Sequence, residues 1–288
     1  MGEDFIADRR IAEGYGMHRP FLHKQVLEMA LSDEQRTGAF RQGLDVGCGA
    51  GLSAKALGAY CRSVTGIDAS GEMVAAARRQ CQEPSYTFRQ CRAEELSLPA
   101  DSFDIVTAAG VTDWVDEAGF LTGLSRVIKD GGILLVYDFW ITDRMEGNSG
   151  YTDWWQTQYL NRFPKQTSEH FCNGRGWSEE RAKAMGFAAD RSASFVLWHS
   201  FDREGLVRFL LLQSNVNAWI VETGEAASAK CWLTQTLTPV FNRAEEVLLF
   251  DGYYRRYTYH GSKRDFGAGQ GRTDVGGICG GVFSETAL

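Results

Sequence analysis

Between residues 43 and 140, short apolar runs alternate with stretches of helical character. The runs, each expected to be a strand, are Gly43–Val46, Ser63–Ile67, Tyr86–Gln90, Phe103–Ala108 and Ile133–Tyr137. The expected helices lie near 52–60, 70–82 and 116–129. Strands that alternate with helices are joined by right-handed crossovers and form a parallel sheet with helices on its faces. The pattern therefore predicts an α/β fold.

The sequence on either side of this core has a different character. We expect four parts: an N-terminal helical lid over 1–42, the core over 43–140, the rest of the sheet with an inserted helical cap over 141–260, and a flexible Gly-rich tail over 261–288. The cap is expected to comprise about 141–176 and 203–242. Its predicted helices lie at about 151–160, 178–185, 203–221 and 225–242, and β structure is expected at about 191–200 and 247–259. Within the last of these, Asp251-Gly252 is a turn signal.

Composition excludes several classes of protein. The net charge of −7 over 288 residues does not suit a nucleic-acid partner, because affinity for nucleic acid depends on Lys and Arg. The apolar runs are too short to cross a membrane, and the start of the chain does not resemble a secretory signal. Seven scattered cysteines without a C-x-x-C pair predict neither a metal site nor disulfides. A cytoplasmic protein is the simplest expectation.

A glycine-rich segment follows the first predicted strand and reads Asp45-Val46-Gly47-Cys48-Gly49-Ala50-Gly51. Glycines between a strand and a helix allow a sharp turn and let a ligand approach the backbone closely. A dinucleotide fingerprint needs a third glycine at position 52, where this chain has Leu52. An acid at the mouth of the loop, Asp45, would repel a pyrophosphate but suits a ligand with an ammonium group.

A second acid, Asp68, ends the second predicted strand 23 residues after Asp45. An acid at this place commonly binds ribose hydroxyls. The alternative is that Asp68 only caps the following helix beside Ser70. Together with the glycine loop, ribose binding is the favoured interpretation.

Four motifs, LDVGCGAG, GIDAS, RAEELSLPADSFDIV and RVIKDGGILLVYD, resemble successive motifs of class I S-adenosylmethionine-dependent methyltransferases. The resemblance covers about residues 40–140. It implies a Rossmann-like, mostly parallel sheet of seven strands in the order 3-2-1-4-5-7-6, with strand 7 antiparallel. It also implies S-adenosylmethionine bound at the carboxyl ends of the first four strands.

Carried over position by position, the resemblance assigns a set of cofactor contacts. Gly47, Cys48 and Gly49 would contact the methionine part, and Asp45 would hold the loop and the ammonium side. Asp68 would bind the ribose, with Ala69, Met73, Ala93 and Glu94 around the adenine. Ala109 and Gly110 would meet the methionine amino group. The family often has an acid where this chain has Arg92, so the contact to the adenine amino group would differ here.

The segment from Tyr15 to Pro20 is similar to the lead-in of small-molecule enzymes like trans-aconitate methyltransferase. In that group Thr112-Asp113-Trp114 often reads Ala-His-Trp, so the identity of a base stays open. The chain has no Pro-Pro pair of the kind found in enzymes that methylate DNA bases. We therefore expect a small-molecule acceptor.

Candidate residues for acceptor chemistry come from the predicted lid, strand ends and cap. We assign His18, Tyr15 and Trp114 as catalytic candidates, and Arg19, Trp140, Trp154, Trp155 and His199 as acceptor-binding candidates. Each has an ordinary structural alternative, because aromatic residues are most often plain core and an imidazole in a strand is most often structural.

The function predicted from these observations is in-line transfer of a methyl group to an oxygen, nitrogen or carbon nucleophile. Such a transfer depends mainly on alignment and on exclusion of water. Two alternatives are a nicotinamide-dependent oxidoreductase and a catalytically silent protein that binds S-adenosylmethionine. Leu52 and Asp45 argue against the first, and the intact loop argues against the second.

Overall fold

The protein is represented by a computed structural model, which describes residues 9–32, 40–165 and 177–261. The predicted flexible tail after residue 261 lies outside the described residues, as do parts of the predicted lid and of the predicted insertion.

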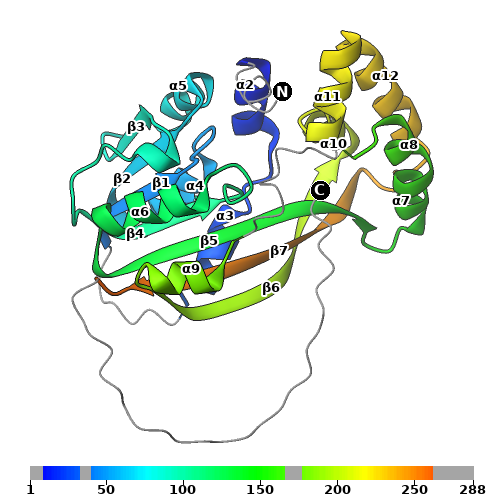
Figure 1. Ribbon diagram of the computed structural model, residues 1–288. Helices are drawn as coiled ribbons and strands as arrows, with labels where there is room; N and C mark the ends of the chain where they lie inside the picture. Colours follow the sequence, from blue (N-terminus) through cyan, green and yellow to red (C-terminus); the bar gives the residue numbers. More distant parts are fainter. Residues whose placement is uncertain (1–8, 33–39, 166–176, 262–288) are drawn as a thin grey trace, which may run out of the picture.

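A seven-stranded sheet forms the centre of the molecule (Figure 1). Its strands are β1 (Phe40–Val46), β2 (Cys61–Asp68), β3 (Tyr86–Gln90), β4 (Phe103–Ala109), β5 (Ile128–Met145), β6 (Phe187–Asp202) and β7 (Glu245–Tyr259). The order is β3-β2-β1-β4-β5-β7-β6. Strands β1 to β5 pair in parallel, and β7 runs antiparallel to both β5 and β6. The predicted fold is confirmed.

Helices cover both faces of the sheet. On one face lie α3 (His23–Ala30), α4 (Leu52–Leu57) and α5 (Gly71–Gln80); on the other lie the short η1 (Ala93–Glu95), α6 (Glu117–Val127) and α9 (Glu179–Ala184). Residues on α3, α4 and α5 share one buried cluster with alternate residues of β5, and residues on α6 and α9 share a second cluster with the intervening ones. This division follows from the two-residue period of a strand.

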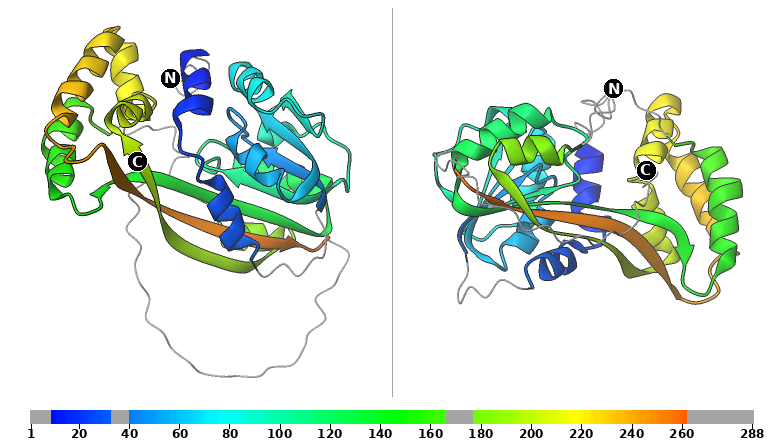
Figure 2. Two further views of the ribbon diagram at one scale, coloured as in Figure 1. Left: turned by 180° about the vertical axis from the view of Figure 1, so that it is seen from behind. Right: turned by 60° about the horizontal axis from the view of Figure 1, so that its bottom comes forward.

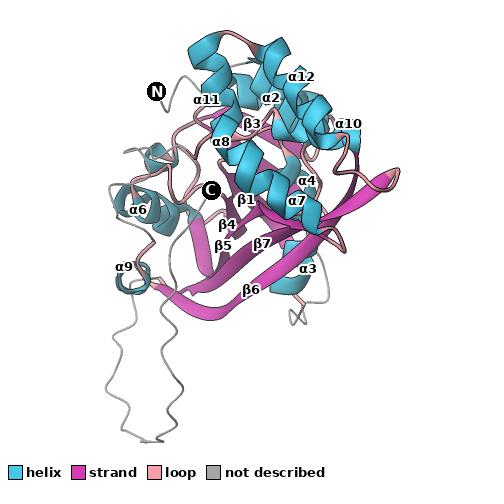
Figure 3. Cartoon of the chain, turned by 90° about the vertical axis from the view of Figure 1, so that its right-hand side faces the viewer, coloured by secondary structure: helices cyan, strands magenta, loops and turns pink. Residues whose placement is uncertain are grey.

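A second group of helices, which we call the helical lobe, lies beyond the end of β5 (Figures 1 and 3). It consists of α7 (Ser149–Trp154), a π-helical turn (Trp155–Tyr159), α8 (Leu160–Arg162), α10 (Arg203–Leu210), α11 (Ser214–Thr223) and α12 (Ala226–Leu237). The N-terminal helix α2 (Arg9–His18) stands between this lobe and the β1–β4 half, as both views agree (Figures 1 and 2).

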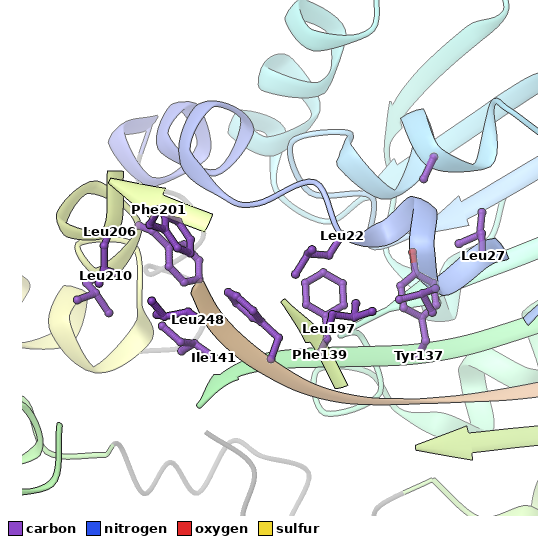
Figure 4. Packing of buried hydrophobic residues seen from close by; sticks show 14 of the residues in the cluster. Leu22, Leu27, Tyr137, Phe139, Ile141, Leu197, Phe201, Leu206, Leu210 and Leu248 are labelled. Carbon is purple, nitrogen blue, oxygen red and sulfur yellow. The ribbon is translucent and has the colours of Figure 1, made fainter. Parts of the chain in front are cut away.

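Three long strands, β5, β7 and β6, run beneath both halves (Figure 2). On one face of β5, Tyr137, Phe139 and Ile141 form a continuous apolar row (Figure 4). The row begins beneath α3 and ends near α10 of the lobe. The two halves therefore share one hydrophobic core.

Three expectations about local structure are wrong. Residues 141–145 continue β5 and do not begin an insertion. The helix expected over 203–221 is divided into α10 and α11. Asp251-Gly252 makes no turn, because both residues pair with β5 and β6 inside an unbroken β7. A glycine is needed at 252 for space: a Cβ there would lie 2.4 Å from Phe195 Cε2 and 2.6 Å from the Asp138 carbonyl oxygen.

In the described part of the chain, none of the helices has the length and apolar character needed to cross a membrane. The cysteines at 48, 61, 81, 91 and 231 are free thiols.

Candidate active site

The glycine loop between β1 and α4 has the backbone conformation that its sequence predicts. Gly47, Gly49 and Gly51 have φ values of +65°, +50° and +93°, which side chains rarely tolerate. A Cβ at Gly47 would lie 2.3 Å from a methyl carbon of Val111, so this glycine is required by packing. A Cβ at Gly49 would meet nothing within 4 Å. The Gly49 backbone therefore borders open space, as a ligand-binding loop requires.

Asp45 lies fully buried at the end of β1 and secures this loop. Its two carboxylate oxygens accept hydrogen bonds from Ser53 Oγ at 2.6 Å and Thr107 Oγ1 at 2.7 Å. Burial raises the pKa of Asp45 to about 7, although these two donors oppose the shift. The carboxylate thus ties the start of α4 to β4, while a contact with a ligand ammonium stays a prediction.

Asp68 connects the glycine loop to the end of β2. The Gly49 amide donates to Asp68 Oδ2 at 2.9 Å, and the Ser70 amide donates to Oδ1 at 2.9 Å. The N-cap of α5 is Ser70, whose hydroxyl accepts from the Met73 amide at 3.3 Å. Burial raises the pKa of Asp68 above its usual range. Helix capping therefore belongs to Ser70, and Asp68 holds the open face of the loop; ribose binding stays a prediction.

The residues predicted to surround the adenine lie in different environments. Ala69 is exposed, whereas Met73 and Ala93 are buried. Glu94 Oε1 accepts a hydrogen bond from the Asp116 amide at 3.0 Å, and its other oxygen lies 3.7 Å from Arg92 Nε. Glu94 thus connects η1 to the N-terminus of α6, and Arg92 makes an ion pair with it. Cys48 is buried, Ala109 is partly buried and Gly110 is exposed.

The N-terminal helix α2 covers the side of the glycine loop. Ile11 and Ala12 are fully buried in a small cluster with Ala50 of the loop, Met73 of α5 and Leu212 of the α10–α11 connection. Tyr15 packs against this cluster, and the Arg19 guanidinium lies over its ring, 4.7 Å from the centroid. The structure thus brings Tyr15 close to the loop and Arg19 onto the Tyr15 ring, while the role of this segment as a lid stays a prediction.

His18, at the end of α2, lies toward the helical lobe. Burial lowers the pKa of His18, and the charge of Arg208 on α10 lowers it further. Both effects favour the neutral imidazole, and the catalytic role of His18 stays a prediction.

A polar cluster lies where β4 ends beside β5, and the sequence analysis did not single out its central members. It consists of Asp138 on β5, Tyr253 on β7, Thr112 and Asp113 in the β4–α6 connection, and Arg19. Asp138 and Tyr253 are directly paired across the antiparallel ladder, and therefore share a face of the sheet. A Cβ on Gly110 would lie 3.2 Å from Asp138 Oδ1. The cluster thus adjoins a predicted cofactor contact.

The electrostatics of this cluster are unusual. Burial raises the pKa of Asp138 to about 6, and the charge of Asp113 raises it while that of Arg19 lowers it. Burial and the Asp138 charge also raise the pKa of Tyr253, whose hydroxyl is hydrogen-bonded to Thr112. Perturbed carboxyl groups at the carboxyl end of a parallel sheet are candidates for a functional site. In the sequence, the signal for Asp138 is that it directly follows the most apolar predicted run, Ile133–Tyr137.

The predicted tryptophans divide into two groups. Trp114 is 43% exposed after β4, and the half-buried Trp140 lies next to Tyr253, with ring centroids 6.4 Å apart. By contrast, Trp154 and Trp155 are only 2% and 4% exposed. They belong to an aromatic core of the lobe that also contains Tyr151, Tyr159, Phe163, Trp219 and Trp232. Packing in the lobe explains the burial of Trp154 and Trp155. A role for these two residues in acceptor binding stays a prediction.

His199 lies on β6, opposite Leu248 of β7, whereas Asp138 pairs with Tyr253. Five residues of strand separate these two levels, roughly 17 Å along the ladder. The His199 ring packs edge-on against Phe201, and burial lowers its pKa. The structure does not bring His199 to the polar cluster.

A cavity of about 620 Å³ lies on the lobe between α7 and the α12–β7 connection. It shares no residue with the glycine loop, with the ends of β2 and β4, or with the polar cluster. Trp154 is one of its lining residues. This cavity is therefore separate from the candidate active site.

Comparison with known proteins agrees with this geometry. Residues 44–136 match the model of a methyltransferase domain. An uncharacterized methyltransferase of Bacillus subtilis is 37% identical over 99 residues, which are 33% of this chain and 39% of that protein. A ubiquinone biosynthesis O-methyltransferase of Bradyrhizobium is 36% identical over 96 residues, which are 32% of this chain and 38% of that protein. The chain thus matches well under half the length of these relatives.

A solved structure shows the same fold over a longer stretch. A protein of Anaeromyxobacter dehalogenans assigned as a type II methyltransferase superposes with a TM-score of 0.59 at 18% identity. The superposition covers 82% of this chain and 95% of that one. The matched domain spans β1 to β5 and includes the glycine loop, Asp68 and Gly110. The chain thus contains a match to a methyltransferase domain over β1 to β5, within a seven-stranded Rossmann-like fold of the kind seen in class I methyltransferases.

Proposed function

We propose that the chain transfers a methyl group from S-adenosylmethionine to a small-molecule acceptor. The observation that carries this proposal is the cradle at Gly49, where the backbone borders open space and Asp68 holds the loop from the side. A cofactor with a ribose and an amino acid moiety fits such a site, because it needs carboxylate acceptors and close backbone approach but no phosphate-binding lysine.

The residues of the chain would have separate roles in this reaction. Asp68 has unused lone pairs for ribose hydroxyls, since each of its oxygens accepts one protein hydrogen bond. Gly47, Gly49 and Gly110 would allow the backbone to contact the amino acid moiety. When bound, S-adenosylmethionine supplies an activated methyl group. The chain then has to align the acceptor with that methyl and exclude water, which α2 and the neighbouring lobe support.

Calorimetry with S-adenosylmethionine and S-adenosylhomocysteine tests the proposal, with NADH as the comparison ligand. We expect micromolar binding of the first two and no binding of NADH. Asp68→Ala should weaken binding by about 2–3 kcal/mol, the usual loss for hydrogen bonds to a charged group. Asp68→Asn should also weaken binding, because its amide nitrogen would face one of the two backbone donors and cannot accept a hydrogen bond.

Gly49→Val should weaken binding more severely than Asp68→Ala, since its side chain would enter the open space and requires an unfavourable positive φ. Far-ultraviolet circular dichroism checks that each variant is folded. Binding of NADH in place of S-adenosylmethionine would overturn the proposal, and full affinity in Gly49→Val would refute this position of the cofactor.

A further inference from the structure

Asp138 presents an unused carboxylate oxygen beside Gly110. Its Oδ1 accepts from the Phe139 amide at 2.7 Å and lies 3.2 Å from the position of a Cβ on Gly110. Among the described residues, none donates a hydrogen bond to Oδ2. Asp138 is partly exposed, so this oxygen is open to a hydrogen-bond donor from outside the protein, and a ligand cation can supply one.

The groups near Asp138 come from three other segments. Arg19 follows α2, Asp113 follows β4, and Tyr253 lies opposite on β7. The two carboxyl groups outnumber the one guanidinium, and the guanidinium is also engaged with the Tyr15 ring. The cluster therefore attracts a cation and repels an anion.

Aromatic rings complete the surroundings. Trp140 and Tyr253 lie with ring centroids 6.4 Å apart, and Trp140 shares the Asp138 face of β5 by the two-residue period. Aromatic faces beside carboxylates are the environment in which proteins bind organic ammonium groups. The charges and the aromatic rings thus both favour an organic cation.

We propose that the methyl acceptor is an organic amine and that Asp138 accepts its proton. This inference rests on the proposed methyltransferase function. An amine reaches the site as an ammonium ion, and Asp138 Oδ2 takes one of its protons, which frees the nitrogen lone pair. The nitrogen then forms a bond to the methyl carbon while the carbon–sulfur bond breaks and its electron pair stays on sulfur. The methylated ammonium product leaves, and the proton on Asp138 passes to solvent.

The pKa of Asp138 near 6 is appropriate for this role, because the group is ionised at pH 7 yet basic enough to accept a proton. Asp113 and Arg19 act on it in opposite directions. Activity should therefore rise with pH through about 6. Asp113→Asn should lower that inflection, and Arg19→Gln should raise it.

The full-length chain is assayed with S-adenosylmethionine and matched panels of primary amines, phenols and carboxylic acids, following release of S-adenosylhomocysteine. We expect turnover of amines alone. With the best amine, Asp138→Asn should reduce kcat at least 100-fold and abolish the inflection near pH 6. Glu222→Gln, which removes an exposed carboxylate on α11, is the matched control and should behave as wild type.

Calorimetry separates this role from a contact between Asp138 and the cofactor. We expect Asp138→Asn to bind S-adenosylmethionine and S-adenosylhomocysteine within about twofold of wild type. A selective loss of affinity for the cationic S-adenosylmethionine would assign Asp138 to the sulfonium and overturn the inference. Turnover of no amine in the panel would also overturn it, whichever phenol or acid reacts. If neither cofactor form binds the wild-type chain, the proposed function itself fails.

Discussion

Three aspartates near the ends of parallel strands have different environments, although they are the same residue type. Asp45 is sealed inside by Ser53 and Thr107, and Asp68 accepts two backbone hydrogen bonds at the edge of the loop. Asp138 keeps one oxygen that accepts no hydrogen bond from the described part of the chain. These environments fit three different roles: structural support for Asp45, ligand binding for Asp68 and proton transfer for Asp138.

The sequence predicted the first two of these acids but not the third. Asp45 and Asp68 lie in short motifs, where the spacing to the glycines carries the information. Asp138 acquires its significance from Tyr253, Asp113 and Arg19, which are distant in sequence and meet only because β7 pairs with β5 and α2 folds over the loop. No local pattern contains such a cluster.

Asp138→Asn should stabilise the folded chain at pH 8 by about 1–3 kcal/mol and leave its stability nearly unchanged at pH 4. Because burial raises the folded pKa of Asp138 to about 6, ionisation above that pH costs the folded state more than the unfolded state. Near pH 4 and below, the carboxyl is largely protonated in the folded state, so the penalty is small. Urea unfolding at the two pH values measures the difference. Reduced stability of the variant at pH 8 would contradict this environment.

At the scale of elements, the sequence predicted the parallel part of the sheet better than its long antiparallel part. The core strands are short apolar runs, which are recognisable locally. In the outer half of β5, Phe139 and Ile141 face the core, whereas Asp138 and Trp140 face the other side. Only this two-residue alternation identifies the segment as a strand. In β7, Gly252 has the appearance of a turn residue but serves close packing.

Replacement of Gly252 with valine tests that interpretation. The new side chain would collide with the Phe195 ring and the Asp138 carbonyl oxygen, so we expect destabilisation of at least about 1–3 kcal/mol, the usual cost of overpacking. Ser194→Val on the neighbouring strand β6 is the control, since Ser194 is exposed and pairs with Tyr253. Equal urea midpoints for the two variants would show that Gly252 is not needed for space.

At the scale of the whole molecule, α2 connects the cofactor half to the helical lobe. It packs against Ala50 and Met73 on one side and against Leu212 on the other. A hydrogen bond from Arg10 of α2 to Asn217 Oδ1 of α11 adds a polar link. The sequence predicted a lid over the first 42 residues, but its attachment to the lobe depends on partners about 200 residues away, and no spacing rule reveals them.

Leu212→Ala should loosen α2 specifically, because it removes buried contacts to Ile11 and Ala12. Hydrogen exchange within residues 9–18 should become at least about tenfold faster, which corresponds to about 1.4 kcal/mol, while β1 and β4 change little. Leu237→Ala on α12, which is also buried but belongs to another cluster, should not accelerate exchange in α2 selectively. Equal acceleration in both variants would mean that α2 is not anchored by Leu212.

The long strands have a mechanical consequence. The ladders of β5, β7 and β6 run under both halves, so a rotation of one half against the other has to distort both ladders together. The helix α2, by contrast, contacts the cofactor half and the lobe through side chains. A displacement of α2 therefore leaves the pairing of these strands intact.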